Sequence, residues 1–193
     1  MPVEVAAFVA IAFAPWPESV PIALPLIVVA TLARLIRGKS WGELFHRRGA
    51  WLAVAAGAAA LGVALLAGTP LIEAMTAQTV GWAQFPMVRG NTAGLLPVAM
   101  LVAAITAGME LGLRGWVVDR ALEFAPPVVA VAIGAGAEAL LADGTWNRVG
   151  AACFGAGLGW MYVASGRNLA VPVCARLAFQ LGCVGLEYVR VIG

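Results

Sequence analysis

The residues with the chemistry to form a site stand near the end of a long apolar run, in the segment Met109-Glu110-Leu111-Gly112-Leu113-Arg114-Gly115. A carboxylate and a guanidinium four residues apart lie on one face of a helix and can form an ion pair. Ionisable side chains in apolar surroundings are costly, so they are usually paired and often functional. Glu110 and Arg114 are therefore the first candidates for a buried site.

Two further charges, Glu138 and Arg176, lie inside later apolar runs, and Gln180 follows Arg176 by one helical turn. Two acids and two bases sum to zero, and pairing lowers the cost of burying them. The pattern predicts one neutral cluster, in which Glu138 and Arg176 contact each other directly or through Glu110 and Arg114. Three interpretations stay open: a network that fixes helix register, a ligand or substrate site, and independent extension of the charges to the membrane interfaces.

The composition is that of a membrane protein. The chain has 193 residues, of which 62% are hydrophobic and 11% are charged, whereas soluble domains carry roughly 25% charged residues. This much apolar surface does not fit into one water-soluble core. We therefore expect an all-α, polytopic transmembrane helix bundle, with residues 1–193 forming one membrane-embedded domain in a bacterial-type inner (plasma) membrane.

Apolar segments of spanning length, at about 20 residues per span, predict six main spans at 20–36, 50–67, 93–107 with a continuation to 120, 127–141, 149–165 and 169–184. The short apolar segment 5–15 is predicted as a short first span or as a re-entrant or interfacial helix. Pro25 can kink the first main span, and 69–89 is predicted to be an outer loop, with an interfacial helix as an open alternative. Small residues from Gly155 to Gly159 allow close helix approach, inside the bundle or in a dimer.

Basic residues gather around the segment 37–48, which we call the basic elbow: Arg34, Arg37, Lys39, Arg47 and Arg48. Lys and Arg concentrate in short cytoplasmic loops, so the elbow is expected to be cytoplasmic. Binding of anionic lipid headgroups is the functional alternative. Six spans place both termini opposite the elbow, whereas a crossing by 5–15 moves the N-terminus to the elbow side.

Several motifs between residues 40 and 180 resemble, in their order, those of the CPBP family of CAAX-protease and bacteriocin-processing intramembrane glutamic proteases. Ser40-Trp41-Gly42-Glu43-Leu44 resembles the family's W-x-x-L elbow, and Met109 to Gly115 resembles its E-E-x-x-x-R-G motif. Gly134 to Glu138 stands where F-x-x-x-H is expected. Phe154 to Pro172 resembles F-x-x-x-x-G-x-x-Y-x-x-T-G-N-L-x-x-P, with Arg167 as a one-residue insertion. The resemblance implies a CPBP-like core over 40–180.

The positions that this resemblance makes catalytic carry other residues here: Met109 for the first glutamate, Glu138 and Arg176 for the two histidines, and Gln180 for the asparagine. A thioether cannot accept a catalytic proton, and an arginine is not a base near neutral pH. Glu138 can serve as a base if burial raises its pKa, and Arg176 or Gln180 can in principle stabilise an oxyanion. The simplest inference is that the proteolytic machinery has been lost.

Three functions remain as hypotheses. The leading one is a non-catalytic CPBP-like membrane protein, a pseudoprotease acting as a scaffold, binding or assembly component, because a base is the hardest part of the chemistry to replace. The second is a CPBP-type intramembrane peptidase with a rearranged site that uses Glu138 and Glu110. The third is a small transporter or channel subunit that uses the polar residues as a path.

No cofactor and no metal ion is expected. His46 is the only histidine, and the three cysteines, Cys153, Cys174 and Cys183, contain no CxxC motif, so a zinc or di-iron centre is not indicated. The expected partners are the lipid bilayer and a membrane protein or a second copy of the chain. A nucleic-acid partner is not expected.

Overall fold

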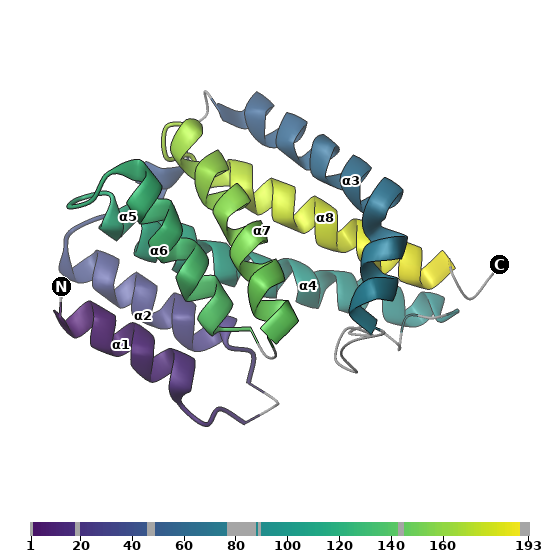
Figure 1. Ribbon diagram of the computed structural model, residues 1–193, viewed down its shortest axis with the longest axis horizontal. Coiled ribbons are helices and arrows are strands. Elements are labelled where there is room, and N and C mark those ends of the chain that lie inside the picture. Colours follow the sequence, from purple (N-terminus) through teal and green to yellow (C-terminus); the bar gives the residue numbers. More distant parts are fainter. Residues whose placement is uncertain are drawn as a thin grey trace.

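The computed structural model describes residues 2–17, 20–45, 49–76, 88, 90–142 and 145–189. Its elements are α1 (Pro2–Phe13), α2 (Ala23–Ile36), the 3-10 turn η1 (Gly42–Leu44), α3 (Ala50–Thr76), α4 (Thr92–Gly112), the π-helix η4 (Leu113–Val118), α5 (Asp119–Ala121), α6 (Pro127–Leu140), α7 (Thr145–Ala164) and α8 (Ala170–Val189) (Figure 1). The described part of the chain holds no strand. The prediction of an all-α fold is confirmed.

Three helical stretches are long and apolar enough to cross a membrane, at 50–68, 92–121 and 170–189. Helices α2 and α6 each have 14 residues, which corresponds to about 21 Å and falls short of a hydrocarbon core of about 30 Å. Helix α7 has 20 residues but carries Asn147 and Arg148 in its first turn. Helices therefore form at all six predicted main spans, and three of these helices have the length and hydropathy of a span.

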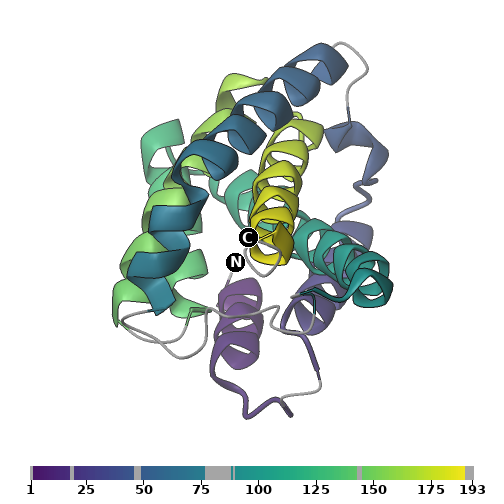
Figure 2. The ribbon, with the colours of Figure 1, turned by 90° about the vertical axis from the view of Figure 1, so that its right-hand side faces the viewer.

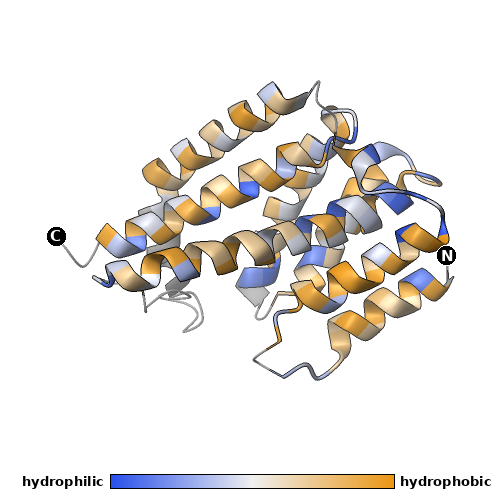
Figure 3. Ribbon diagram, turned by 180° about the vertical axis from the view of Figure 1, so that it is seen from behind, coloured by the Kyte–Doolittle hydropathy of each residue, from blue (hydrophilic) through white to orange (hydrophobic). Residues whose placement is uncertain are grey.

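The continuous stretch α4–η4–α5 runs through the middle of the bundle. It packs against α2 and α8, and its π-helical part also contacts α6 and α7. Helix α3 lies along α8, and α6 pairs with α7 (Figures 1 and 2). Helices α1 and α2 consist mostly of apolar residues, and hydrophilic residues gather at the end of the bundle near the N-terminus (Figure 3). The central stretch carries most of the candidate site.

One end of the bundle brings together the start of α1, the basic elbow and two later turns. Glu4 lies 3.8 Å from Arg37, and Arg37 lies 3.1 Å from Glu123. The amide of Leu169 donates to the carbonyl of Leu44 at 2.7 Å. The N-terminal end of α1 therefore lies on the same side of the bundle as the basic elbow. This is the position expected if segment 5–15 extends from one side of the bundle to the other.

Two local predictions are wrong. Helix α2 begins at Ala23, so Pro25 lies in its first turn, where a missing amide hydrogen costs no helical bond. Pro25 therefore breaks no backbone hydrogen bond inside α2, so it does not cause the kink predicted in the helix interior. The predicted outer loop begins too early, because α3 continues through 69–76. Leu71, Glu73, Ala74 and Met75, which follow Pro70, rank high in helix propensity. The rest of that loop, except Val88, and the predicted Asp143-Gly144 turn lie outside the described residues.

The small residues of α7 serve internal packing at two of their positions. A Cβ added at Gly155 would lie 3.2 Å from Cα of Ala135, and one added at Gly159 would lie 3.3 Å from a methyl of Val131. Both contacts are with α6. Gly157 has no such neighbour within 4 Å. Gly155 and Gly159 therefore allow α6 and α7 to approach closely.

Candidate functional site

Four charged side chains inside the bundle form one closed network, which we call the charge cluster: Glu110, Arg114, Glu138 and Arg176. Glu110 lies in α4, Arg114 one turn later in η4, Glu138 near the end of α6 and Arg176 inside α8. Arg114 contacts Glu110 at 3.1 Å and Glu138 at 2.6 Å. Arg176 contacts Glu110 and Glu138, both at 2.8 Å. The predicted neutral cluster and the predicted direct contact of Glu138 with Arg176 are both confirmed.

The charge cluster is almost entirely shut off from solvent, and Arg176, 11% exposed, is its most exposed member. The side chains of Glu110 and Arg114 are 0% exposed, and that of Glu138 is 3% exposed. Arg114 also donates to the carbonyl of Gly155 at 2.9 Å. A Cβ at Gly155 would lie only 2.7 Å from Glu138 Oε2, so a glycine is needed here for the carboxylate to reach Arg114. The guanidinium of Arg176 lies over the ring of Phe154, 5.7 Å from its centroid.

Gln180 lies beside the charge cluster rather than in it. Its side-chain oxygen accepts a hydrogen bond from the hydroxyl of Thr106. The contacts between α4 and α8 thus pair residue 106 with 180 and residue 110 with 176, which is the register of two antiparallel helices. Met109 packs in an apolar cluster with Ala23 and Leu113. Met109 is therefore a core residue.

The arrangement is suited to holding helices together and poorly suited to proton transfer. Both oxygens of Glu138 are taken, one by Arg114 and one by Arg176. Oxygen Oε2 of Glu110 has no hydrogen-bond partner among the described residues, but it is buried, whereas a general base must reach the proton it abstracts. Within the described ranges, no group of three His, Cys, Asp or Glu residues gathers that would suit a metal ion.

A second buried ion pair was missed by the sequence analysis. Arg34, predicted to belong to the solvated elbow, is 1% exposed and contacts Asp119 at 3.1 Å. It also donates to the carbonyls of Gly115 at 2.9 Å and Ser40 at 2.7 Å. The hydroxyl of Tyr162 donates to the other oxygen of Asp119 at 3.1 Å. Because Arg34 follows an apolar run and precedes a basic one, its position in the sequence indicated a helix end rather than a buried pair.

The π-helix η4 joins this pair to the charge cluster. The amide of Asp119 donates to the carbonyl of Arg114, five residues earlier. In an α-helix, residues five apart point about 140° apart, and the wider π turn reduces this difference in direction. Helix α7 contacts both residues: the carbonyl of Gly155 accepts a hydrogen bond from Arg114, and the hydroxyl of Tyr162 donates one to Asp119. Single π turns often occur at functional sites, and no residue pattern in the sequence predicts this one.

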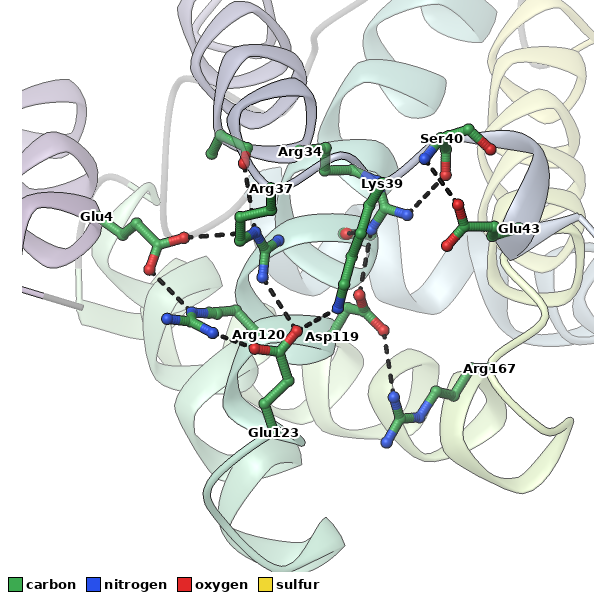
Figure 4. Close-up of polar contacts among 12 residues, drawn as sticks. Glu4, Arg34, Arg37, Lys39, Ser40, Glu43, Asp119, Arg120, Glu123 and Arg167 are labelled. Carbon is green, nitrogen blue, oxygen red and sulfur yellow. Dashed lines mark hydrogen bonds and ion pairs between the residues drawn. The ribbon is translucent and has the colours of Figure 1, made fainter.

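A third group of charges is partly exposed at the elbow end of the bundle, and we call it the elbow network: Glu4, Arg37, Lys39, Arg120 and Glu123 (Figure 4). Arg120 contacts Glu4 at 2.9 Å and also contacts Glu123. Glu123 further contacts Arg37 at 3.1 Å and Lys39. These contacts tie α1, the end of α2 and the turn after α5 together.

Two carboxylates at this end have shifted pKa values. Partial burial alone would raise the pKa of Glu123, but hydrogen bonds and attraction from Lys39 and Arg120 outweigh it, so that the pKa is lowered from 4.5. The amide of Ser40 donates to Glu43 at 2.9 Å, and this bond lowers the pKa of Glu43. The bond closes the turn from Ser40 into η1, whose N-cap is Trp41.

Comparison with known proteins leaves the family of the chain open. No protein-family model, no curated protein and no solved structure matches it.

Proposed function

We propose that the chain is a non-catalytic, CPBP-like integral membrane protein that acts as a scaffold, binding or assembly component in the bilayer. The observation that carries this proposal is the closed charge cluster at the positions where the family resemblance expects catalytic residues. Glu138 and Arg176, at the two histidine positions, contact each other at 2.8 Å. A pair of opposite charges thus fills the place where a peptidase needs an open, hydrated base.

Membrane insertion is supported by the outward surface of the bundle. Large apolar side chains project from α2 and α3, with Ile36 85% and Leu66 88% exposed. Exposed apolar patches of this kind mark contact with lipid or with another protein. The three long apolar helices supply the hydrophobic length of membrane spans. The shorter α2 and α6 would require local thinning of the bilayer or burial among neighbouring helices.

The proposed topology follows from the helix ends that meet. Glu4, the basic elbow and Glu123 share one end of the bundle, so successive long helices alternate in direction. The basic elbow then faces the cytoplasm, with the start of α1 beside it and the end of α8 on the far side. We propose six main spans and an additional short α1, in a bacterial-type inner membrane.

A peptidase with a rearranged centre is the alternative that a cleavage assay separates. The full chain, Glu138→Gln and Met109→Glu are reconstituted in lipid nanodiscs and incubated with a farnesylated CAAX peptide. The expected result is no cleavage by the wild type above the level of Glu138→Gln. Cleavage by the wild type that disappears in Glu138→Gln would refute the non-catalytic proposal. Met109→Glu tests whether restoring the family's glutamate alone restores activity, and the charge cluster predicts that it does not.

The scaffold role is tested by crosslinking in native membranes. The tagged chain is expected to recover a defined membrane protein, or a second copy of itself, in a fixed ratio. Recovery of only the bait, at every crosslinker length and in the same membranes from which it is purified intact, would contradict the scaffold role. Alkaline carbonate extraction of the same membranes checks integral insertion separately.

A further inference from the structure

Three neighbouring helices of the bundle are too short to cross a bilayer of ordinary thickness. Helix α1 has 12 residues, and α2 and α6 have 14 residues each, which corresponds to axial lengths of about 18 Å and 21 Å. Helix α1 packs against α2, and α1 and α6 line the same largely apolar groove. The three helices therefore form one continuous side of the molecule, which we call the short face.

The outward side chains of the short face are apolar along the length of each helix. In α2 they recur every fourth residue, at Leu24, Val28 and Leu32. The corresponding outward positions are Val5, Val9 and Phe13 on α1 and Val129, Ile133 and Leu140 on α6. These side chains are between 41% and 67% exposed. The other described helices of the chain therefore do not shield the short face from its surroundings.

Residues that avoid the hydrocarbon core mark both ends of the short face. At one end lies the elbow network, with Glu4 in the first turn of α1 and Arg37 directly after α2. At the other end, Trp16 follows α1 and is 40% exposed, and tryptophan is enriched where a membrane meets water. The apolar band between these two ends is only about as high as α1 and α2 are long.

The opposite side of the bundle has the full length of a membrane span. Helix α3 lies on the far side of the molecule from α1 in both views (Figures 1 and 2). Its spanning stretch, 50–68, has 19 residues, or about 28 Å, which is close to a hydrocarbon core of about 30 Å. Val54 and Val63 on this stretch are 67% and 53% exposed. The two sides of the molecule thus present apolar bands of different height.

We propose that the protein thins the bilayer locally along the short face and that short-chain phospholipids gather there. This inference rests on the proposed insertion of the chain in a membrane. A helix of about 21 Å leaves about 9 Å of the hydrocarbon core unmatched, and tilting the helix only increases the difference. A bilayer relieves such a mismatch by thinning at a modest cost, whereas moving the charged elbow network into hydrocarbon costs far more.

The first test identifies the lipids beside each side of the molecule by photo-crosslinking. The full chain carries the photoreactive residue benzoylphenylalanine in place of Val28 on the short face or of Val54 on α3. Each protein is reconstituted in equal parts of dimyristoleoyl- and dierucoylphosphatidylcholine, which share a headgroup and differ in chain length. Mass spectrometry should find the shorter lipid enriched about twofold at Val28, because the mismatch cost is spread over several lipids. At Val54 the two lipids should be captured in their bulk ratio.

The second test measures the depth of each side in vesicles of dioleoylphosphatidylcholine. Cys153, Cys174 and Cys183 are replaced by alanine, and a nitroxide label is attached to Leu24→Cys or to Val63→Cys. Both positions lie about 19 Å along their helices from the elbow end, and their side chains are similarly exposed, at 56% and 53%. The label at Leu24 should be relaxed by a water-soluble nickel chelate, and the label at Val63 by oxygen dissolved in the hydrocarbon.

Either of two results would overturn the proposal: equal lipid ratios at Val28 and Val54, or equal depths for the labels at Leu24 and Val63. Crosslinking of Val28 to a protein instead of a lipid would also overturn it, because a partner would then cover the short face. A chain that gives one of these results and stays in carbonate-washed membranes is still inserted, so the thinning alone fails. Release by carbonate refutes the insertion itself, and the thinning fails with it.

Discussion

The charge cluster predicts that Glu138 and Arg176 are coupled in stability. At 2.8 Å, two unit charges attract by about 6 kcal/mol at an effective dielectric constant of about 20, before the cost of removing them from water. Glu138→Gln breaks two ion pairs and leaves a net positive charge in the interior. Arg176→Met leaves a net negative charge instead. Each single change should lower the free energy of unfolding by about 3–5 kcal/mol, because each leaves a buried charge unbalanced.

The double variant Glu138→Gln/Arg176→Met should cost less than the two single changes together. It restores neutrality and leaves Glu110 and Arg114 paired at 3.1 Å. We expect the double variant to be about 2–3 kcal/mol more stable than the sum of the single costs predicts. Unfolding in mixed micelles with rising sodium dodecyl sulfate fraction, followed by the fluorescence of the seven tryptophans, measures all four proteins.

A matched variant at an exposed position controls for the loss of charge itself. Arg148→Met removes an exposed charge outside the charge cluster and should change stability by less than about 0.5 kcal/mol. If the costs of Glu138→Gln and Arg176→Met add within about 0.5 kcal/mol, the two residues are not coupled. The charge cluster would then not hold α6 and α8 together.

Three further predictions concern the surroundings of the charge cluster. Because the pKa of Glu123 is lowered in the folded protein, its carboxylate should stabilise the fold above about pH 4.5 and cease to do so as the pH falls through the lowered pKa. The unfolding midpoints of wild type and Glu123→Gln, measured from pH 6 to pH 3, should therefore converge on acidification. A constant difference between the two midpoints would contradict this prediction. Tyr162→Phe removes the hydroxyl that donates to Asp119 at 3.1 Å and should lower the unfolding free energy by about 1.5–3 kcal/mol; an unchanged thermal midpoint would show that the bond contributes nothing. Gly155→Ala should cost about 1–3 kcal/mol by overpacking, whereas Gly157→Ala, which has open space around it, should be neutral or stabilising; equal effects in thermal unfolding would count against the tight contact with α6.

The sequence by itself determined the helical class and the membership of the charge cluster. Apolar runs of spanning length favour helices, because in lipid a helix satisfies all of its backbone hydrogen bonds within one segment. Glu110, Arg114, Glu138 and Arg176 stand inside such runs, where an unpaired charge is too costly to retain. The cost of burying a lone charge and the zero net charge of the four residues together predicted that they meet, because an apolar segment offers no water to replace a missing partner.

Only the tertiary structure decided which residues meet outside those runs. Arg34 stands at a helix end, where solvent and burial are both possible, and its burial depends on Asp119, 85 residues later. The π turn between Arg114 and Asp119 is held by contacts at both of its ends, and no local residue preference specifies it. These features depend on long-range packing. The residues next to a side chain in the sequence do not determine which distant residue it will contact.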